Sequence, residues 1–173
     1  AGRAGRAGGS EVSAMQLQPF LQLVLSCIEA ETSPELRPWH ARQRHAMLQI
    51  HYGNPRVHYE LWLQSRSGRV EIGLHFEDEP ERNQRWCALF AGRVLELLEA
   101  LGPAVELEEW TANWARLHLT VPLRPLDGPF AAELAERFGR LITATAETVR
   151  EGLPAERPTA VTLHRSARAA LRR

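Results

Sequence analysis

Five short stretches of the chain alternate strictly between apolar side chains and side chains of other kinds. The clearest of them runs from Val57 to Gln64, where V-Y-L-L alternates with H-E-W-Q. A period of two places one set on a hydrophobic core and the other set on the opposite face of a sheet. We therefore expect strands over residues 46–52, 57–64, 69–77, 105–110 and 115–121.

Three other stretches repeat apolar residues at helical spacing and predict helices over residues 18–30, 81–101 and 127–150. Gly102 would end the second helix, and Asp127 is a suitable N-cap for the third. The proline-containing segment 31–44 is predicted as a loop. The element order is then α-β-β-β-α-β-β-α. Because consecutive strands with short turns pair antiparallel, the fold class is α+β with an antiparallel sheet of about five strands.

The chain has 173 residues, and its hydrophobic content of 44% is enough for one core of ordinary size. We assign that core to a single α+β domain over residues 15–153. The Gly/Ala/Arg-rich residues 1–14 are predicted to be a disordered leader, and the arginine-rich residues 154–173 a partly ordered or helical tail. No apolar run approaches the ~20 residues that a membrane-spanning helix needs, so we expect no membrane partner.

The charged residues exclude some chemistry. The 21 basic residues balance 21 acidic ones, and all of the basic residues are arginine. Without lysine there is no phosphate-loop lysine, Schiff base or lysine general base. The balanced charge gives no reason to expect a nucleic-acid partner. Cys27 and Cys87 both fall in apolar helical patterns, where inert thiols are expected, and a reducing cytoplasmic setting follows.

The non-core face of the sheet carries most of the candidate functional residues. If the turns at residues 53–56 and 65–68 set simple registers, His51, His58 and His75 form a row across three strands. Glu60 and Glu77 then lie one pleat away on opposite sides of the row. Such a row is compatible with zinc or another divalent metal, with one coordination position left for water. It is also compatible with a protonation-sensitive binding surface, or with no special role, since histidine is ordinary on a half-exposed sheet surface. Mutual repulsion should lower the pKa of clustered histidines.

The same registers place Met47 opposite Trp62 and create an apolar spot on this face. An exposed tryptophan beside a methionine is usually covered. The cover could be the first helix, the basic tail or a second subunit. The candidate binding surface therefore comprises Met47, His51, His58, Glu60, Trp62, His75 and Glu77.

Enzyme templates fit the chain poorly. The element order resembles that of many metal-dependent nucleases, which carry an aspartate on one strand and Glu-x-Lys on the next. Here Glu71-Ile72-Gly73 occupies the corresponding place, and no lysine completes it. The GxSxG, HExxH, GxGxxG and phosphate-loop motifs are also missing. We therefore assign no catalytic residues and lean against an enzyme.

The element order over roughly residues 18–150 also resembles the fold of small type III secretion chaperones and their bacterial relatives. The resemblance lies in layout alone, and no motif carries it. It implies a cytoplasmic binding domain that dimerises or receives an extended peptide. We expect a non-enzymatic protein-interaction domain of chaperone-like or regulatory type, as a homodimer with a protein or peptide partner and no cofactor. The alternative is a metal-dependent hydrolase or nuclease-like enzyme that uses the histidine row.

Overall fold

A computed structural model describes residues 14–153, so the predicted tail at 154–173 and nearly all of the predicted leader at 1–14 lie outside the described residues. The elements are α1 (Leu17–Glu31), a 3-10 turn (Pro34–Leu36), β1 (His40–Arg44), β2 (Met47–His51), β3 (Val57–Gln64), β4 (Arg69–Phe76), α2 (Pro80–Ala91), α3 (Val94–Leu101), β5 (Glu106–Glu109), β6 (Ala115–Pro122) and α4 (Gly128–Glu151).

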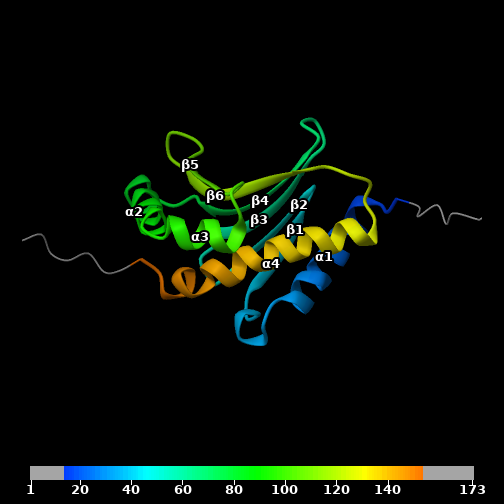
Figure 1. Ribbon diagram of the computed structural model, residues 1–173, viewed down its shortest axis with the longest axis horizontal. Helices are drawn as coiled ribbons and strands as arrows, with labels where there is room; N and C mark the ends of the chain where they lie inside the picture. Colours follow the sequence, from blue (N-terminus) through cyan, green and yellow to red (C-terminus); the bar gives the residue numbers. More distant parts are fainter. Residues whose placement is uncertain (1–13, 154–173) are drawn as a thin grey trace, which may run out of the picture.

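The strands form one antiparallel sheet with the order β1-β2-β3-β4-β6-β5. The helices lie together on one side of this sheet, where α4 runs across it and α1 lies beside α4 (Figure 1). The predicted α+β class is confirmed. A short edge strand (β1) raises the number of strands from the expected five to six.

The hydrophobic core lies between the sheet and the helices, and the alternating apolar residues of the strands supply its sheet side. Tyr59 of β3 packs its ring against Phe138 of α4. The hydroxyl of Tyr59 lies 2.9 Å from Oγ1 of Thr145, so its buried polar end has a partner. Asp127 caps α4 as predicted, because its carboxylate accepts a hydrogen bond of 2.8 Å from the backbone N–H of Phe130.

The registers of the central strands are those predicted from the two short turns. Met47 pairs with Trp62, His58 pairs with His75, and Leu63 pairs with Val70. Since side chains alternate between faces, these pairings put His58 and His75 on the face opposite the helices. The candidate histidines therefore share one surface.

Two predicted elements were wrong. Part of the expected loop at 31–44 is the edge strand β1, which pairs with β2 through a tight turn at His45, a residue with φ of 51°. β1 has no apolar alternation because most of its side chains are exposed. The expected helix over 81–101 is broken at Gly92 into α2 and α3. Glycine is a poor helix former, and Arg93 directly after it leaves the helical conformation with φ of −114° and ψ of 18°, so the chain starts a new helix at Val94.

Within residues 14–153, none of the helices has the length and apolar character needed to cross a membrane.

Candidate functional site

The sheet face opposite the helices carries a nearly closed polar network. The buried side chains of the four helices belong to the core on the other face, so these polar groups are covered by one another and by neighbouring long side chains. Burial without hydrogen-bond partners would be costly, so most of the groups are paired. The most deeply buried members are His58, Glu60, Glu71 and His75, each no more than 5% exposed.

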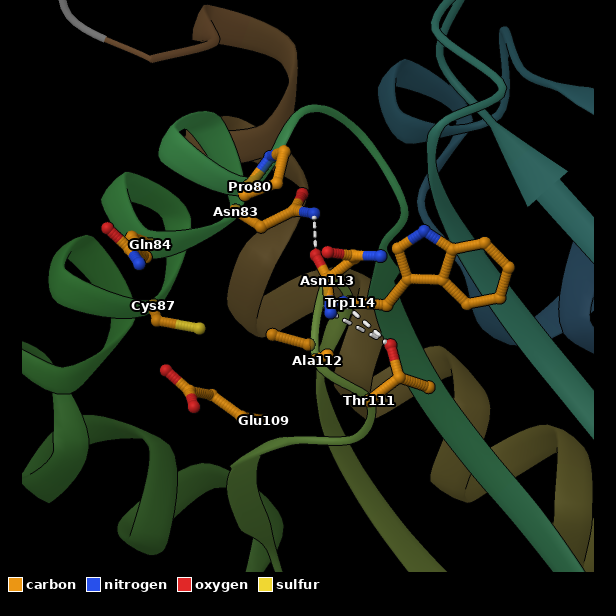
Figure 2. A pocket seen from close by; sticks show the side chains of 10 residues that line it. Pro80, Asn83, Gln84, Cys87, Glu109, Thr111, Ala112, Asn113 and Trp114 are labelled. Atoms are coloured by element: carbon orange, nitrogen blue, oxygen red, sulfur yellow. Dashed lines mark hydrogen bonds between the residues drawn. The ribbon is translucent and has the colours of Figure 1, made fainter.

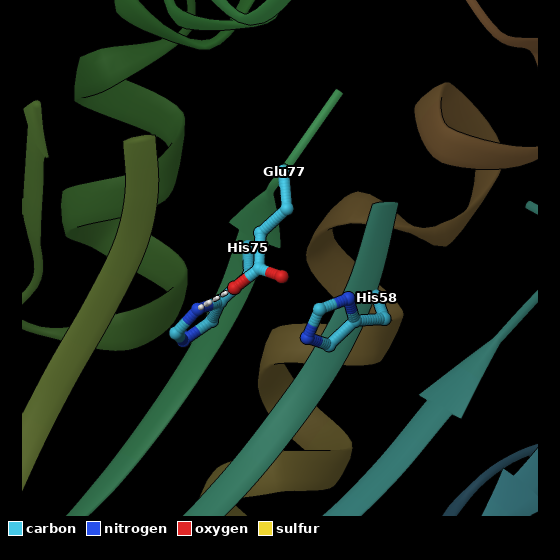
Figure 3. Close-up of side chains that lie close together, drawn as sticks. All are labelled: His58, His75 and Glu77. Carbon is cyan, nitrogen blue, oxygen red and sulfur yellow. Dashed lines mark ion pairs between the residues drawn. The ribbon is translucent and has the colours of Figure 1, made fainter. Parts of the chain in front are cut away.

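His75 is the centre of the network. Its ring crosses over Gly73, and its Nε2 lies 3.0 Å from Oε1 of Glu71, four residues earlier on β4. Its Nδ1 lies 3.8 Å from Oε1 of Glu77 (Figure 3). Burial disfavours the charged ring, but the carboxylates of Glu71, Glu77 and Glu60 outweigh it and raise the pKa of His75 to about 9. His75 is therefore a cation at neutral pH.

His58 lies beside this cation. The two imidazole rings stack with centroids 5.4 Å apart and an interplanar angle of 19°. Nδ1 of His58 donates a hydrogen bond of 2.9 Å to the backbone carbonyl of Pro55. Its Nε2 faces Glu60, 3.6 Å away, and the amide of Gln49, 3.3 Å away. Gln49 also donates to Glu60. Burial raises the pKa of Glu60, but hydrogen bonds from His58 and Gln49 and the charge of His75 bring it below the usual value.

The expectation that clustered histidines would all have lowered pKa values was wrong for His75. Repulsion between imidazoles is weaker there than the attraction of three carboxylates. The expectation does hold for His51, where burial and the charges of His40, His58 and Arg42 lower the pKa. His51 stacks on His40 of β1, with ring centroids 5.1 Å apart.

The strand registers therefore agree with the predicted row, but the side chains of its three histidines do not form a single close group. His58, His75 and Glu77 place one ligand atom each within 4.8 Å of one another, and His51 is not a member of this group. Metal binding by His51, His58 and His75 stays a prediction. A metal that replaced the proton of His75 would compete with Glu71 for the same ring.

Met47 and Trp62 pair as predicted, and both are half-buried. The first helix is not their cover, because α1 packs with α4 on the opposite face of the sheet. Sequence reasoning left the cover open among the first helix, the tail and a second subunit. The fold removes the first of these.

A second half of the network lies on β5 and β6, and its residues were not among the predicted site residues. The guanidinium of Arg116 donates to Oε2 of Glu71 at 2.8 Å and to Oε1 of Glu108 at 2.8 and 2.5 Å. Trp110 lies over this clamp, with the Arg116 guanidinium 4.9 Å from its ring centroid and the ring of His75 5.5 Å away. The alternation of 115–121 was the available signal, because it places Arg116 and His118 on one face.

His118 differs from the other buried histidines. Burial and the charge of Arg116 lower its pKa, although Glu71, Glu108 and Glu106 act in the opposite direction. Its side chain is only 8% exposed, yet neither ring nitrogen makes a hydrogen bond among the described residues. Nε2 lies 3.0 Å from Oε1 of Glu108 and 4.0 Å from Oε2 of Glu106.

A cleft of about 480 Å³ opens over this half of the face, and its volume lies in the range typical of ligand sites. Tryptophans and charged residues of both signs line it, including Trp62, Arg69, Glu106, Trp110, Arg116 and His118. A smaller hollow of about 30 Å³ lies between the start of α2 and the β5–β6 turn (Figure 2). That hollow has room for about one water molecule, so of these two sites on the polar side of the molecule the cleft is the better candidate.

No protein-family model matches the chain, and no curated protein sequence matches it significantly.

Proposed function

We propose that the chain is a non-enzymatic protein-interaction domain that binds a polypeptide segment in the cleft on the uncovered sheet face. The observation that carries the proposal is this cleft of about 480 Å³, with Trp62 and Trp110 among its lining residues. Tryptophans that flank a cleft supply much of the binding energy in protein interfaces. The helices cover the other face, so a partner reaches the cleft without displacing part of the core.

The charges of the cleft define the partner. Arg69 and Glu106 are exposed charges of opposite sign, and the half-buried Arg116 is held by two carboxylates. An extended segment with an apolar or aromatic side chain next to residues of both charge signs is complementary to this lining. We further propose a reducing cytoplasmic location, since Cys27 and Cys87 are both free thiols.

Selection from a random peptide library on the immobilised full-length chain tests this proposal. Selected peptides should carry an aromatic or large apolar residue, and their binding is then measured by fluorescence anisotropy. Trp62→Ala should weaken binding at least about tenfold, because a buried aromatic contact is lost. Glu29→Ala is the control, because Glu29 is exposed on α1 and is not among the residues that line the cleft. Peptides that bind both variants equally, or no selection above background, would contradict the proposal.

The alternative of a metal-dependent enzyme has one observation in its favour, namely the close approach of His58, His75 and Glu77. The proton on His75 opposes it, because a metal ligand must be unprotonated. Metal analysis of the purified chain, with His58→Ala as the control, separates the two functions. A stoichiometric metal that is lost in His58→Ala would favour the enzyme.

A further inference from the structure

We propose that Glu106, Glu108 and His118 form a binding site for a divalent transition metal such as zinc at the β5–β6 end of the sheet. Each residue offers one ligand atom, and these atoms lie within 4.8 Å of one another. The proposal is independent of peptide binding, because metal affinity is measured on the chain alone.

The ligand spacing suits a metal of this kind. Bonds of about 2.0–2.1 Å at tetrahedral angles place neighbouring ligand atoms about 3.3 Å apart. Nε2 of His118 lies 3.0 Å from the Glu108 carboxylate and 4.0 Å from the Glu106 carboxylate, so the observed separations lie on both sides of that value. Small side-chain movements of the exposed Glu106 bring the three atoms to coordination distance.

The bonding state of His118 points to a ligand. A buried imidazole normally has a hydrogen-bond partner on at least one nitrogen. Burial of a ring that makes no hydrogen bond at either nitrogen costs free energy. Both nitrogens of His118 lack one, although Glu108 lies within 3.0 Å of Nε2. The carboxylate therefore lies off the direction in which the ring nitrogen donates or accepts. A metal ion between the two would satisfy both groups.

The surroundings support the same reading. Arg116 holds the carboxylate of Glu108 with two short charge-assisted hydrogen bonds, as groups that orient metal ligands do. Its positive charge is offset, because three carboxylates, Glu71, Glu106 and Glu108, face the cations Arg116 and His75 in this part of the network. Three protein ligands leave a fourth position that opens toward the cleft.

The other close group, His58, His75 and Glu77, lacks this feature. Nε2 of His75 is bonded to Glu71 and Nδ1 of His58 to the Pro55 carbonyl, so each ring has one nitrogen engaged, although Nδ1 of His75 makes no hydrogen bond. The β5–β6 group is the one whose histidine has both nitrogens unused. We therefore assign the metal to His118.

Isothermal titration calorimetry of the chelator-treated full-length chain with zinc chloride tests the assignment. We expect a site of 1:1 stoichiometry that is weakened at least about tenfold in His118→Ala, because even groups that only orient ligands contribute about 10–100-fold. His58→Ala should leave this site unchanged. Calcium chloride should give no comparable binding, because calcium prefers oxygen ligands.

Glu106→Gln is the decisive second variant, because Glu106 is exposed and its replacement keeps the shape of the side chain. It should weaken zinc binding while the unfolding temperature of the metal-free chain stays that of wild type. The assignment is overturned if wild type binds no zinc, if binding is lost in His58→Ala instead, or if Glu106→Gln and a folded His118→Ala both bind as wild type does.

Discussion

Replacement of Gly73 by alanine tests how the polar network is built. Gly73 lies in the middle of β4, between Glu60 of β3 and His118 of β6, and the His75 ring crosses over it. A Cβ atom here would lie 3.0 Å from Nε2 of His75 and 3.0 Å from Cβ of His118. Neither neighbour is free to move, since Glu71 holds the first and the β6 backbone holds the second. The methyl group should therefore push the His75 ring away from Glu71.

The expected loss of stability follows from these contacts. A hydrogen bond between charged groups contributes about 1.5–3 kcal/mol, and overpacking of a tight site costs about 1–3 kcal/mol. Alanine in place of a strand glycine restores about 0.5–1 kcal/mol, because it reduces the freedom of the unfolded chain. Together these contributions should lower the free energy of unfolding by about 2–5 kcal/mol. At about 2–4 °C per kcal/mol for a chain of this length, the unfolding temperature should fall by about 4–20 °C.

Thermal unfolding followed by circular dichroism measures this change. Gly128→Ala is the matched control, because a Cβ atom added at the start of α4 meets nothing within 4 Å. The control should be as stable as wild type. If Gly73→Ala is equally stable, the ring of His75 does not lie over this residue, and the account of its raised pKa fails with it.

The two remaining predictions concern pH and self-association. His75 binds its proton more tightly in the folded chain than the ordinary pKa of 6.5 implies, so its stabilisation is complete below pH 6.5 and is lost as the pH rises toward 9. Chemical denaturation should show that the free energy of unfolding falls by up to about 3 kcal/mol over this pH range. An equal fall in a His75→Gln variant would contradict this assignment. Val94, Leu95 and Leu98 form an exposed apolar row on α3, with Leu95 78% exposed. Light scattering should find a dimer that Leu95→Asp converts to a monomer, whereas a strictly monomeric wild type would refute this interface.

The central strands could be predicted because two constraints agree on them. The alternation of 57–64 and 69–77 permits only registers that keep the apolar residues on one face. The short turn at 65–68 then selects one of these, and the observed pairing of His58 with His75 is the result. β1 obeys neither constraint. Its residues H-A-R-Q-R lie at the sheet edge outside the core. Their strand conformation therefore depends on backbone pairing with β2, and the sequence shows no apolar alternation that would predict it.

The protonation of His75 could not be read from the sequence. Its decisive partner, Glu71, is two pleats away on the same strand, and the ring reaches it only because residue 73 has no side chain. Neighbouring histidines suggested repulsion, but the pKa depends on all charges around the ring. The clamp of Arg116 on Glu71 joins residues 45 positions apart. It depends on β6 pairing with β4, which no local pattern predicts.

These contacts change which part of the sheet face is available for binding. The histidines that attract attention in the sequence, His58 and His75, each have a ring nitrogen engaged, Nδ1 of His58 by the Pro55 carbonyl and Nε2 of His75 by Glu71. A ligand would have to break those bonds, and each costs about as much as a new contact would return. His118, isolated in the sequence, has unused nitrogens beside a cleft. The capacity to bind therefore lies at the β5–β6 end, where both nitrogens of His118 lack hydrogen bonds, and not where histidines are most numerous.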